Sequence, residues 1–306
     1  MRLFTLVGPT GIGKTAIGVE LARKFDLEII SVDSRQIYKD LDIGTAKPPK
    51  EIQAEIKFHM IDIVNIDELY SAGEFARDCR KLIYMLKDNK REFILVGGSG
   101  LYFKALFEPF FDAPPRNNIL RKKLSQEPIS VLYEKLKKID PIWAIRISPN
   151  DRQRIIRALE IYEQTKKPIS YHTRHKTVSE FIPYYVGITM DRNRLYQQID
   201  ARFEEMVKKG LIKEVQEILR KGYSEELNAL KSIGYKEIIG YLKGRLSLED
   251  AIRLAKRNSR MYAKRQLTWF KKIPGIRWIE YTNFEETTSL VLHEYEKYLE
   301  EREKNS

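Results

Sequence analysis

A glycine-rich stretch near the N-terminus, residues 8–15, reads GPTGIGKT and matches the pattern G-x-x-x-x-G-K-[ST]. An apolar, strand-like run (3–7) precedes it and a helical pattern (14–25) follows it, which makes the match credible. Backbone N–H groups of such a turn point at an anion, Lys14 adds a positive charge, and the Thr15 hydroxyl can bind Mg²⁺. The motif therefore predicts a site for a diphosphate or a triphosphate, without saying which. The residues of this site are Gly8, Pro9, Thr10, Gly11, Ile12, Gly13, Lys14 and Thr15.

A second candidate for chemistry is Asp33, which lies at the end of the strand-like run 27–34. An ordinary nucleotide hydrolase of this type carries an acid at the end of a later strand, to hold Mg²⁺ and orient water. Here the run 93–96 ends in glycines and serine, with no acid. The carboxyl ends of parallel strands line the ligand crevice, so Asp33 is expected to face the 8–15 loop and act as a base. The alternative is that Asp33 only caps a turn.

The elements that must position these residues alternate between strand and helix, which is typical of a parallel, doubly wound sheet. The strand-like runs lie at 3–7, 27–34, 58–64 and 93–96, and the helical patterns at 14–25 and 72–90. After the Pro-Pro pair at 114–115 the chain becomes helical and basic, until the run 184–190 predicts a strand that returns to the sheet. We predict an α/β fold with a P-loop-type parallel sheet and flanking helices, formed by residues 1–112 and 184–306. An inserted helical domain is expected at 113–183.

The composition favours a polyanionic partner, because 55 Lys and Arg against 43 Asp and Glu give a net charge of +12. The single cysteine, Cys79, excludes an intrachain disulfide and argues against a cysteine-based zinc site. His172 and His175 lack further ligands nearby in the sequence and are expected to be surface residues. No apolar stretch approaches the roughly 20 residues of a membrane span, and no leader-like segment opens the chain. We therefore expect a soluble, cytoplasmic protein.

Two helical segments carry basic faces. In the segment 247–272 a stripe without acids is predicted, formed by Arg253, Lys256, Arg257, Arg260, Lys264 and Lys271. In the segment 149–165, Ile155 and Ile156 belong to the expected buried face, while Gln153, Arg154 and Arg157 lie on the other side. Such surfaces suit a large anionic partner, and the alternative is a plain solvated face.

The ordered motifs of the chain resemble those of the tRNA dimethylallyltransferase family, also called tRNA isopentenyl-diphosphate transferases. They extend over nearly the whole chain. The N-terminal motifs are GPTGIGKT (8–15), SVDSRQIY (31–38), LDIGTAKP (41–48), HMIDI (59–63), YSAGEF (70–75) and LVGGSGLYFKAL (95–106). The later motifs are NDRQRIIRALEIYEQTKKPIS (150–170), SIGYKE (232–237) and YAKRQLTWF (262–270). Eukaryotic members often add a C-terminal zinc finger, whereas a chain with one cysteine resembles the shorter bacterial form.

The resemblance implies transfer of a dimethylallyl group from dimethylallyl diphosphate to N6 of adenosine 37. The acceptors are tRNAs that read codons beginning with U, and the products are N6-(dimethylallyl)adenosine and diphosphate. Asp33 matches the family's aspartate, which would accept the N6 proton. Thr10 and Arg202 match family residues at the leaving group, and Thr15 would hold Mg²⁺, the implied cofactor. The phosphates in the 8–15 loop would then be those of a prenyl diphosphate.

The resemblance also implies the anticodon stem-loop of tRNA as partner, no membrane, and a monomer. The tRNA-binding residues that it implies in the core are Asp33, Ser34, Arg35, Gln36 and Ser99. Those that it implies in the insertion are Arg121, Gln153, Arg154, Ile155, Ile156 and Arg157.

Two rival readings stay open at this point. A small-molecule kinase can also carry an aspartate on its second strand and a glycine turn on its third. The basic inserted helix argues against it, because a small substrate needs no such surface. A non-catalytic RNA-binding protein is the other rival, and the intact Lys14, Thr15 and Asp33 argue against that one.

Overall fold

The computed structural model describes residues 1–108, 114–174 and 179–304. Contacts divide the chain into two compact units. The core unit comprises Met1–Phe107 and Glu180–Ser306, and the helical unit comprises Glu108–Ser179. Residue 113, where the insertion was expected to begin, and His175 lie outside the described residues. In the described part, no helix is both long and apolar enough to cross a membrane.

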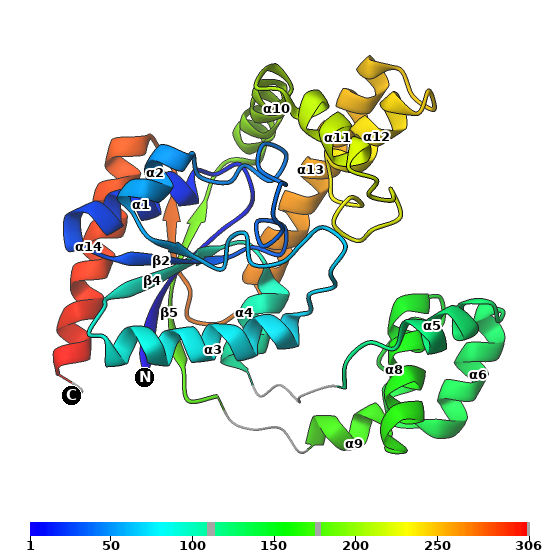
Figure 1. The fold of residues 1–306 in the computed structure, drawn as a ribbon. Helices are drawn as coiled ribbons and strands as arrows, with labels where there is room; N and C mark the ends of the chain where they lie inside the picture. Colours follow the sequence, from blue (N-terminus) through cyan, green and yellow to red (C-terminus); the bar gives the residue numbers. More distant parts are fainter. Residues whose placement is uncertain (109–113, 175–178, 305–306) are drawn as a thin grey trace. The chain divides into compact units, whose positions relative to one another are not determined.

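The core unit is built on six parallel strands in the order β3-β2-β4-β1-β5-β6 (Figure 1). The strands are β1 (Arg2–Val7), β2 (Glu28–Val32), β3 (Phe58–His59), β4 (Phe93–Gly97), β5 (Ile182–Thr189) and β6 (Arg277–Glu280). This confirms the predicted α/β parallel sheet with flanking helices. Residues 182 and 183, which the sequence placed in the insertion, belong to β5.

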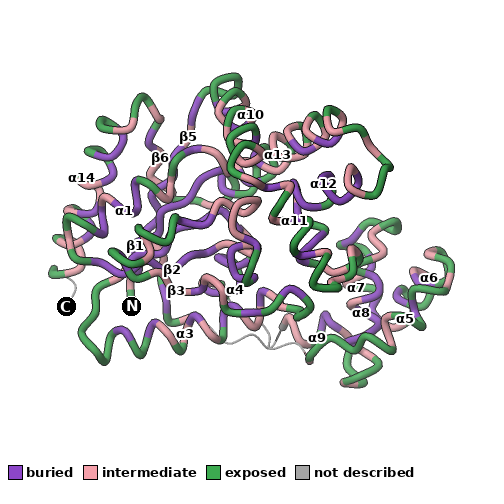
Figure 2. Tube along the Cα trace, turned by 45° about the horizontal axis from the view of Figure 1, so that its top comes forward, coloured by how far each residue is buried: buried purple, intermediate pink, exposed green. Residues whose placement is uncertain are grey.

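Helices cover both faces of this sheet. The helices of the core unit are α1 (Lys14–Phe25), α2 (Lys50–Glu55), α3 (Ala72–Asp88), α4 (Gly100–Phe107), α10 (Arg192–Lys208), α11 (Leu211–Arg220), α12 (Tyr235–Leu242), α13 (Leu248–Phe270) and α14 (Phe284–Glu303). Side chains alternate along each strand, so neighbouring residues serve opposite faces. Phe4 and Tyr184 pack with Tyr295 and Tyr298 of α14, while Tyr185 meets Phe103 of α4. Most residues of β1, β2, β4 and β5 are consequently buried, as the purple colour of Figure 2 shows.

Local sequence explains where the helices begin. Ser71 accepts a hydrogen bond from the Glu74 N–H and the Glu74 carboxylate accepts one from the Ser71 N–H, which starts α3 with a capping box. Ser247 accepts from the Asp250 N–H at 3.0 Å and starts α13 at the position that the sequence predicts.

The helical unit packs around its own apolar core. Its helices are α5 (Asn118–Ser125), α6 (Ile129–Ile139), α7 (Pro141–Ala144), α8 (Arg152–Thr165) and α9 (Ile169–Arg174). Leu132 and Leu136 of α6 meet Ile155 and Leu159 of α8 in this core. Buried Asp140 joins two segments, because it accepts hydrogen bonds from the N–H groups of Trp143 and Ser170.

Candidate active site

The 8–15 loop connects β1 to α1 at the carboxyl edge of the sheet. Gly11 and Gly13 have φ of +84° and +90°, a region that residues with a Cβ rarely adopt. A Cβ on Gly11 would also lie 2.7 Å from Cγ1 of Ile199. Ile12 is buried in the core and anchors the loop there. No side chain caps α1 and its first turn holds no acid, so its N-terminal N–H groups can bind an anion.

Lys14 is the first residue of α1 and its ammonium donates to the carbonyl of Pro9 at 2.6 Å. Burial and the positive charge of Arg202 lower the pKa of Lys14 to about 7, and the charge of Asp33 opposes this shift only in part. The cavity beside Lys14 therefore has a positive potential that an anionic ligand would relieve.

Thr10, Arg202 and Asp33 meet at one place although they come from three distant segments. Arg202 of α10 donates to the hydroxyl of Thr10 at 3.2 Å. Burial lowers the pKa of Arg202, and the negative charge of Asp33 partly restores it. The structure thus brings together all three residues that the resemblance assigned to the reaction.

Asp33 also caps a turn, which was the alternative considered for it. Its Oδ1 accepts from the N–H of Arg35 at 2.8 Å and from that of Gln36 at 3.4 Å. No described residue hydrogen-bonds to Oδ2. The two readings are therefore compatible: one oxygen fixes the turn, and the other is left for a ligand.

Two cavities, of about 510 and 380 Å³, share the wall on which these residues lie. The residues that line both are Thr10, Gly11, Asp33, Thr45 and Arg202. The larger one, the loop cavity, also contains Lys14 and Thr15. The smaller one, the α13 cavity, is lined by Tyr262 and Arg265 of α13 and by Phe203 of α10. If one ligand occupied the loop cavity and another the α13 cavity, the two ligands would come together at Asp33.

The segment 41–49 contributes to the lining of both cavities, and residues without an assigned role hold it in place. Glu214 of α11 accepts hydrogen bonds from the N–H groups of Asp42, Ile43 and Gly44, and from the Tyr235 hydroxyl. The motifs LDIGTAKP and SIGYKE mark the segment and Tyr235, but Glu214 has no signal in the sequence. Its role depends on a contact between residues more than 170 positions apart.

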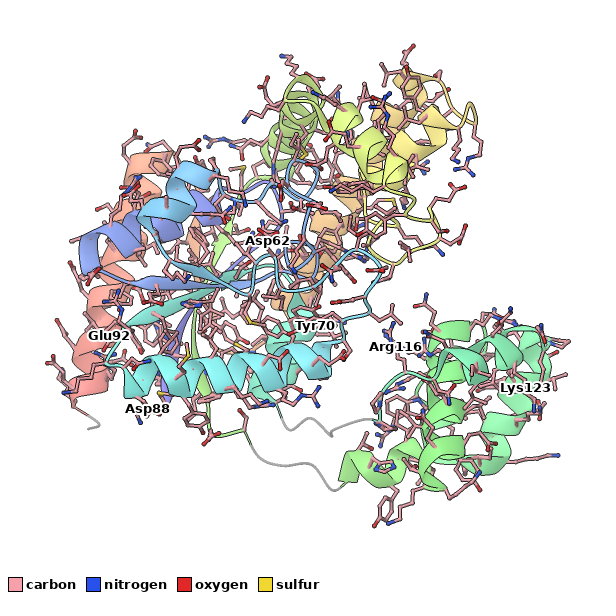
Figure 3. All side chains as sticks on the ribbon, in the orientation of Figure 1. Asp62, Tyr70, Asp88, Glu92, Arg116 and Lys123 are labelled. Atoms are coloured by element: carbon pink, nitrogen blue, oxygen red, sulfur yellow. The ribbon has the colours of Figure 1, made fainter. Side chains whose placement is uncertain are left out.

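A buried ammonium secures the same segment from the other side. Lys47 donates to the carbonyl of Tyr38 at 2.6 Å and forms ion pairs with Asp42 and Asp62. Asp62, labelled in Figure 3, follows β3 and has a φ of +55°. The segment is therefore fixed by charge and hydrogen bonds rather than by apolar packing alone.

The core residues that the resemblance assigned to tRNA differ in exposure. Ser34 and Arg35 line the α13 cavity, and Arg35 donates to the carbonyl of Asn228 at 2.9 Å. Ser99 is buried and accepts from the Ser34 N–H at 3.0 Å. Gln36 is buried and bonds to Ser31 and to the carbonyls of Thr45 and Ala46. Ser99 and Gln36 thus brace the wall of the site in this structure.

In the helical unit, two of the three assigned arginines contact a fully buried carboxylate. Glu160 pairs with Arg121 at 3.0 Å and with Arg157 at 2.6 Å. Burial would raise the pKa of Glu160, but hydrogen bonds from Arg157 and from the Asn117 N–H outweigh it and lower the pKa. Gln153 and Arg154 are exposed, whereas Ile155 and Ile156 are buried, as the helical pattern predicted.

Removing this carboxylate is expected to destabilise the helical unit. Glu160→Ala leaves two partly buried guanidinium groups without their partner, at a cost of about 3 kcal/mol of unfolding free energy. Denaturant unfolding followed by fluorescence of Trp143, in a Trp269→Phe, Trp278→Phe background, measures it. The exposed Glu163 pairs with Lys166, so Glu163→Ala is the control, with a change within about 0.5 kcal/mol. Equal effects of the two substitutions would contradict this account.

The basic stripe expected along α13 is interrupted by carboxylates. Three of its cations form ion pairs: Arg253 with Asp250, Lys256 with Glu204, and Arg260 with Asp200. Two of these acids belong to α10, which the helix pattern of 247–272 could not reveal. The remaining cations of the stripe, Arg257, Lys264 and Lys271, are exposed. Half of the predicted stripe is thus paired with carboxylates of this chain.

Comparison with family models matches residues 36–273 to the family described as IPP transferase. The chain belongs to this family. It is 41% identical over 306 residues to the tRNA dimethylallyltransferase of Natranaerobius thermophilus, covering 96% of this chain and 92% of the relative. It is 43% identical over 295 residues to that of Alkaliphilus oremlandii, covering 94% of each. The family resemblance read from the motifs is therefore confirmed.

Solved structures agree with this assignment. The tRNA isopentenylpyrophosphate transferase of Bacillus halodurans is 37% identical and matches with a TM-score of 0.74, covering 99% of this chain and 98% of that one. A eukaryotic dimethylallyltransferase, solved acting on tRNA, is 29% identical and matches with a TM-score of 0.79, covering 91% of this chain and 73% of that one. This chain is accordingly a prenyltransferase by family and by fold.

Proposed function

We propose that this protein transfers a dimethylallyl group from dimethylallyl diphosphate to N6 of adenosine 37 in tRNAs that read codons beginning with U. The observation that carries the proposal is the meeting of two cavities at Asp33, Thr10 and Arg202. One cavity contains the anion-binding loop and the other opens beside basic and aromatic side chains. The names of the relatives support the same reaction.

The donor would bind with its diphosphate in the 8–15 loop. The N–H groups at the start of α1, the Lys14 ammonium and the Arg202 guanidinium would hold its oxygens. The hydroxyl of Thr15 fits one coordination position of Mg²⁺, an ion that is usually held by few protein oxygens and by substrate phosphates. When bound, Mg²⁺ would offset the negative charge that grows on the leaving diphosphate.

Asp33 would act on the acceptor amine. The N6 nitrogen attacks the allylic carbon, the new C–N bond forms, and the bond from that carbon to the diphosphate oxygen breaks. The amine is a poor nucleophile because its lone pair is delocalised into the purine. Oδ2 of Asp33, which no described residue bonds, would take the proton that N6 loses. The diphosphate leaves with the electron pair, next to Thr10 and Arg202.

The acceptor base would enter through the α13 cavity. Unstacking an adenine from the anticodon loop costs a few kcal/mol, and basic side chains that bind the tRNA phosphates can offset this cost. Arg35 and Arg265 line this cavity, and Gln153 and Arg154 of the helical unit are exposed for further contacts. Both cavities lie within one core unit, so we propose that a monomer suffices and that it meets its tRNA in the cytoplasm.

The pKa of Lys14 predicts a proton linked to donor binding. One pH unit above about 7, Lys14 of the free protein is mostly neutral, and a bound diphosphate raises its pKa again. Binding of inorganic diphosphate is then expected to take up about one proton, and to weaken as pH rises through this range. Below that pKa the uptake disappears, because Lys14 is already charged. Calorimetry in buffers of different ionisation enthalpy measures the uptake.

Lys14→Met corrects for protons taken up by the diphosphate itself. The difference in proton uptake between wild type and this variant is expected to be about one above the pKa of Lys14. Identical uptake by the two proteins would show that Lys14 does not charge on binding.

A small-molecule kinase is the rival that shares the loop and Asp33. The test is to incubate the protein with Mg²⁺, unmodified tRNA, a mixture of small phosphate acceptors and either dimethylallyl diphosphate or ATP, and to measure released diphosphate or ADP. We expect one diphosphate per prenylated tRNA, and no turnover of ATP. Phosphate transfer from ATP to a small acceptor, without prenyl transfer, would overturn the proposal.

A further inference from the structure

Gln266 of α13 joins two walls of the site. Its Oε1 accepts from the N–H of Thr10 at 2.8 Å, and its Nε2 donates to the carbonyl of Gly98 at 2.9 Å. The side chain is buried and lines the loop cavity. A backbone N–H can only donate and a carbonyl can only accept, so these partners fix the orientation of the amide.

The two bonds of Gln266 lie between the groups proposed for the leaving group and for the base. On one side, Thr10 accepts from Arg202 through its hydroxyl. On the other, the residue after Gly98 is Ser99, whose hydroxyl accepts from the N–H of Ser34, next to Asp33. The connection thus runs from Arg202 to the backbone beside Asp33, through these hydrogen bonds and the Gly98–Ser99 peptide, and Gln266 of α13 joins its two halves.

The contact with the turn after β4 is close. A Cβ on Gly98 would lie 2.3 Å from Nε2 of Gln266, so the glycine lets the amide reach the carbonyl. The Thr10 N–H is turned to Gln266 and is therefore not directed at a phosphate. Gln266 is uncharged, so its effect on the site is to fix the positions of Thr10 and Gly98.

We propose that Gln266 is a positioning residue, which aligns the leaving-group contacts of Thr10 and Arg202 with the base Asp33. The proposal rests on the proposed function, because it assigns the two sides their roles. If it holds, loss of Gln266 slows the transfer step and leaves binding of both substrates nearly unchanged, since its amide is engaged by the Thr10 N–H and the Gly98 carbonyl. A small misplacement of reacting groups is enough to slow such a step strongly.

Gln266→Met tests this, because methionine has a similar length and shape but makes neither bond. The single-turnover rate, with both substrates saturating, is expected to fall about 10- to 100-fold. The dissociation constants of tRNA and of dimethylallyl diphosphate are expected to change by less than about threefold. Gln164→Met is the matched control, since Gln164 also donates to a backbone carbonyl but lies in the helical unit.

Gln266→Glu gives a second readout that a loss of folding cannot imitate. A carboxylate keeps the acceptor for Thr10 but opposes the Gly98 carbonyl, whereas its protonated form can donate to that carbonyl. Its rate relative to wild type is therefore expected to rise as pH falls. Burial would raise the pKa of this carboxyl and nearby cations would lower it, so only the direction is predicted. The charged groups in the same cavity are Lys14, Glu20, Arg23, Asp33, Lys47 and Arg202.

The outcomes separate this inference from the proposed function. An active wild type with an equally active Gln266→Met overturns the inference alone. So does a variant whose substrate affinities fall by the same factor as its rate, or a Gln266→Glu protein whose relative rate is flat with pH. A wild type that transfers no prenyl group overturns the proposed function, and this inference with it.

Discussion

Replacing Asp33 is expected to lower the single-turnover rate of prenyl transfer by about 10²- to 10⁴-fold, while the affinity for tRNA is largely kept. Asp33→Asn keeps an oxygen for the turn that Oδ1 caps, so it isolates the lost base. Asp33→Ala removes both roles and is expected to be at least as slow. Rapid quenching with saturating labelled donor and tRNA measures the rate, and filter binding measures the affinity.

The comparison between the two variants decides what Asp33 does. If it only shapes the turn, Asp33→Asn should transfer at the wild-type rate while Asp33→Ala does not. A loss of tRNA binding with an unchanged single-turnover rate in both would also contradict the role of a base.

Lys14→Met is expected to lower the transfer rate by about 10²–10³, which is typical of losing one preorganised group at a developing negative charge. The ammonium lies at the start of α1, close enough to Arg202 for the two positive charges to act on each other. When the bond from the allylic carbon to the diphosphate breaks, negative charge grows on the diphosphate oxygens, and the positive charge of Lys14 would stabilise it. The rate is measured with saturating donor, so that weaker binding does not enter.

Lys24→Met is the control for this variant. Lys24 lies on the same helix, is exposed, and pairs with Glu296 at 2.9 Å far from the loop. It is expected to leave the rate unchanged. A Lys14→Met protein that reaches the wild-type rate at high donor concentration would show that Lys14 serves ground-state binding only.

The fold could be predicted from the sequence where the patterns are long and local. β1, β2, β4 and β5 lie where the apolar runs were found. β6 was missed, because it is short and pairs only with β5. A strand was expected over 58–64, but β3 comprises only Phe58–His59. Met60 and Asp62 have positive φ and turn the chain out of the sheet.

The site could be predicted where the motif itself carries the chemistry. The 8–15 loop, Asp33 and Arg202 were found from motifs, and the structure places them around one pair of cavities. Gln266 and Glu214 were not assigned, because their partners lie far away in the sequence and only the fold brings them together. The same reason explains why the acids of α10 that neutralise part of α13 were missed.

The most direct test of the account locates the transferred group. The purified protein is incubated with unmodified tRNA, Mg²⁺ and radiolabelled dimethylallyl diphosphate, and the tRNA is digested and its nucleosides are separated. The account predicts label on N6 of the adenosine that follows the anticodon, and none in a tRNA with guanosine at that position. Label at another nucleoside, or a tRNA without label while ATP is consumed, would contradict it.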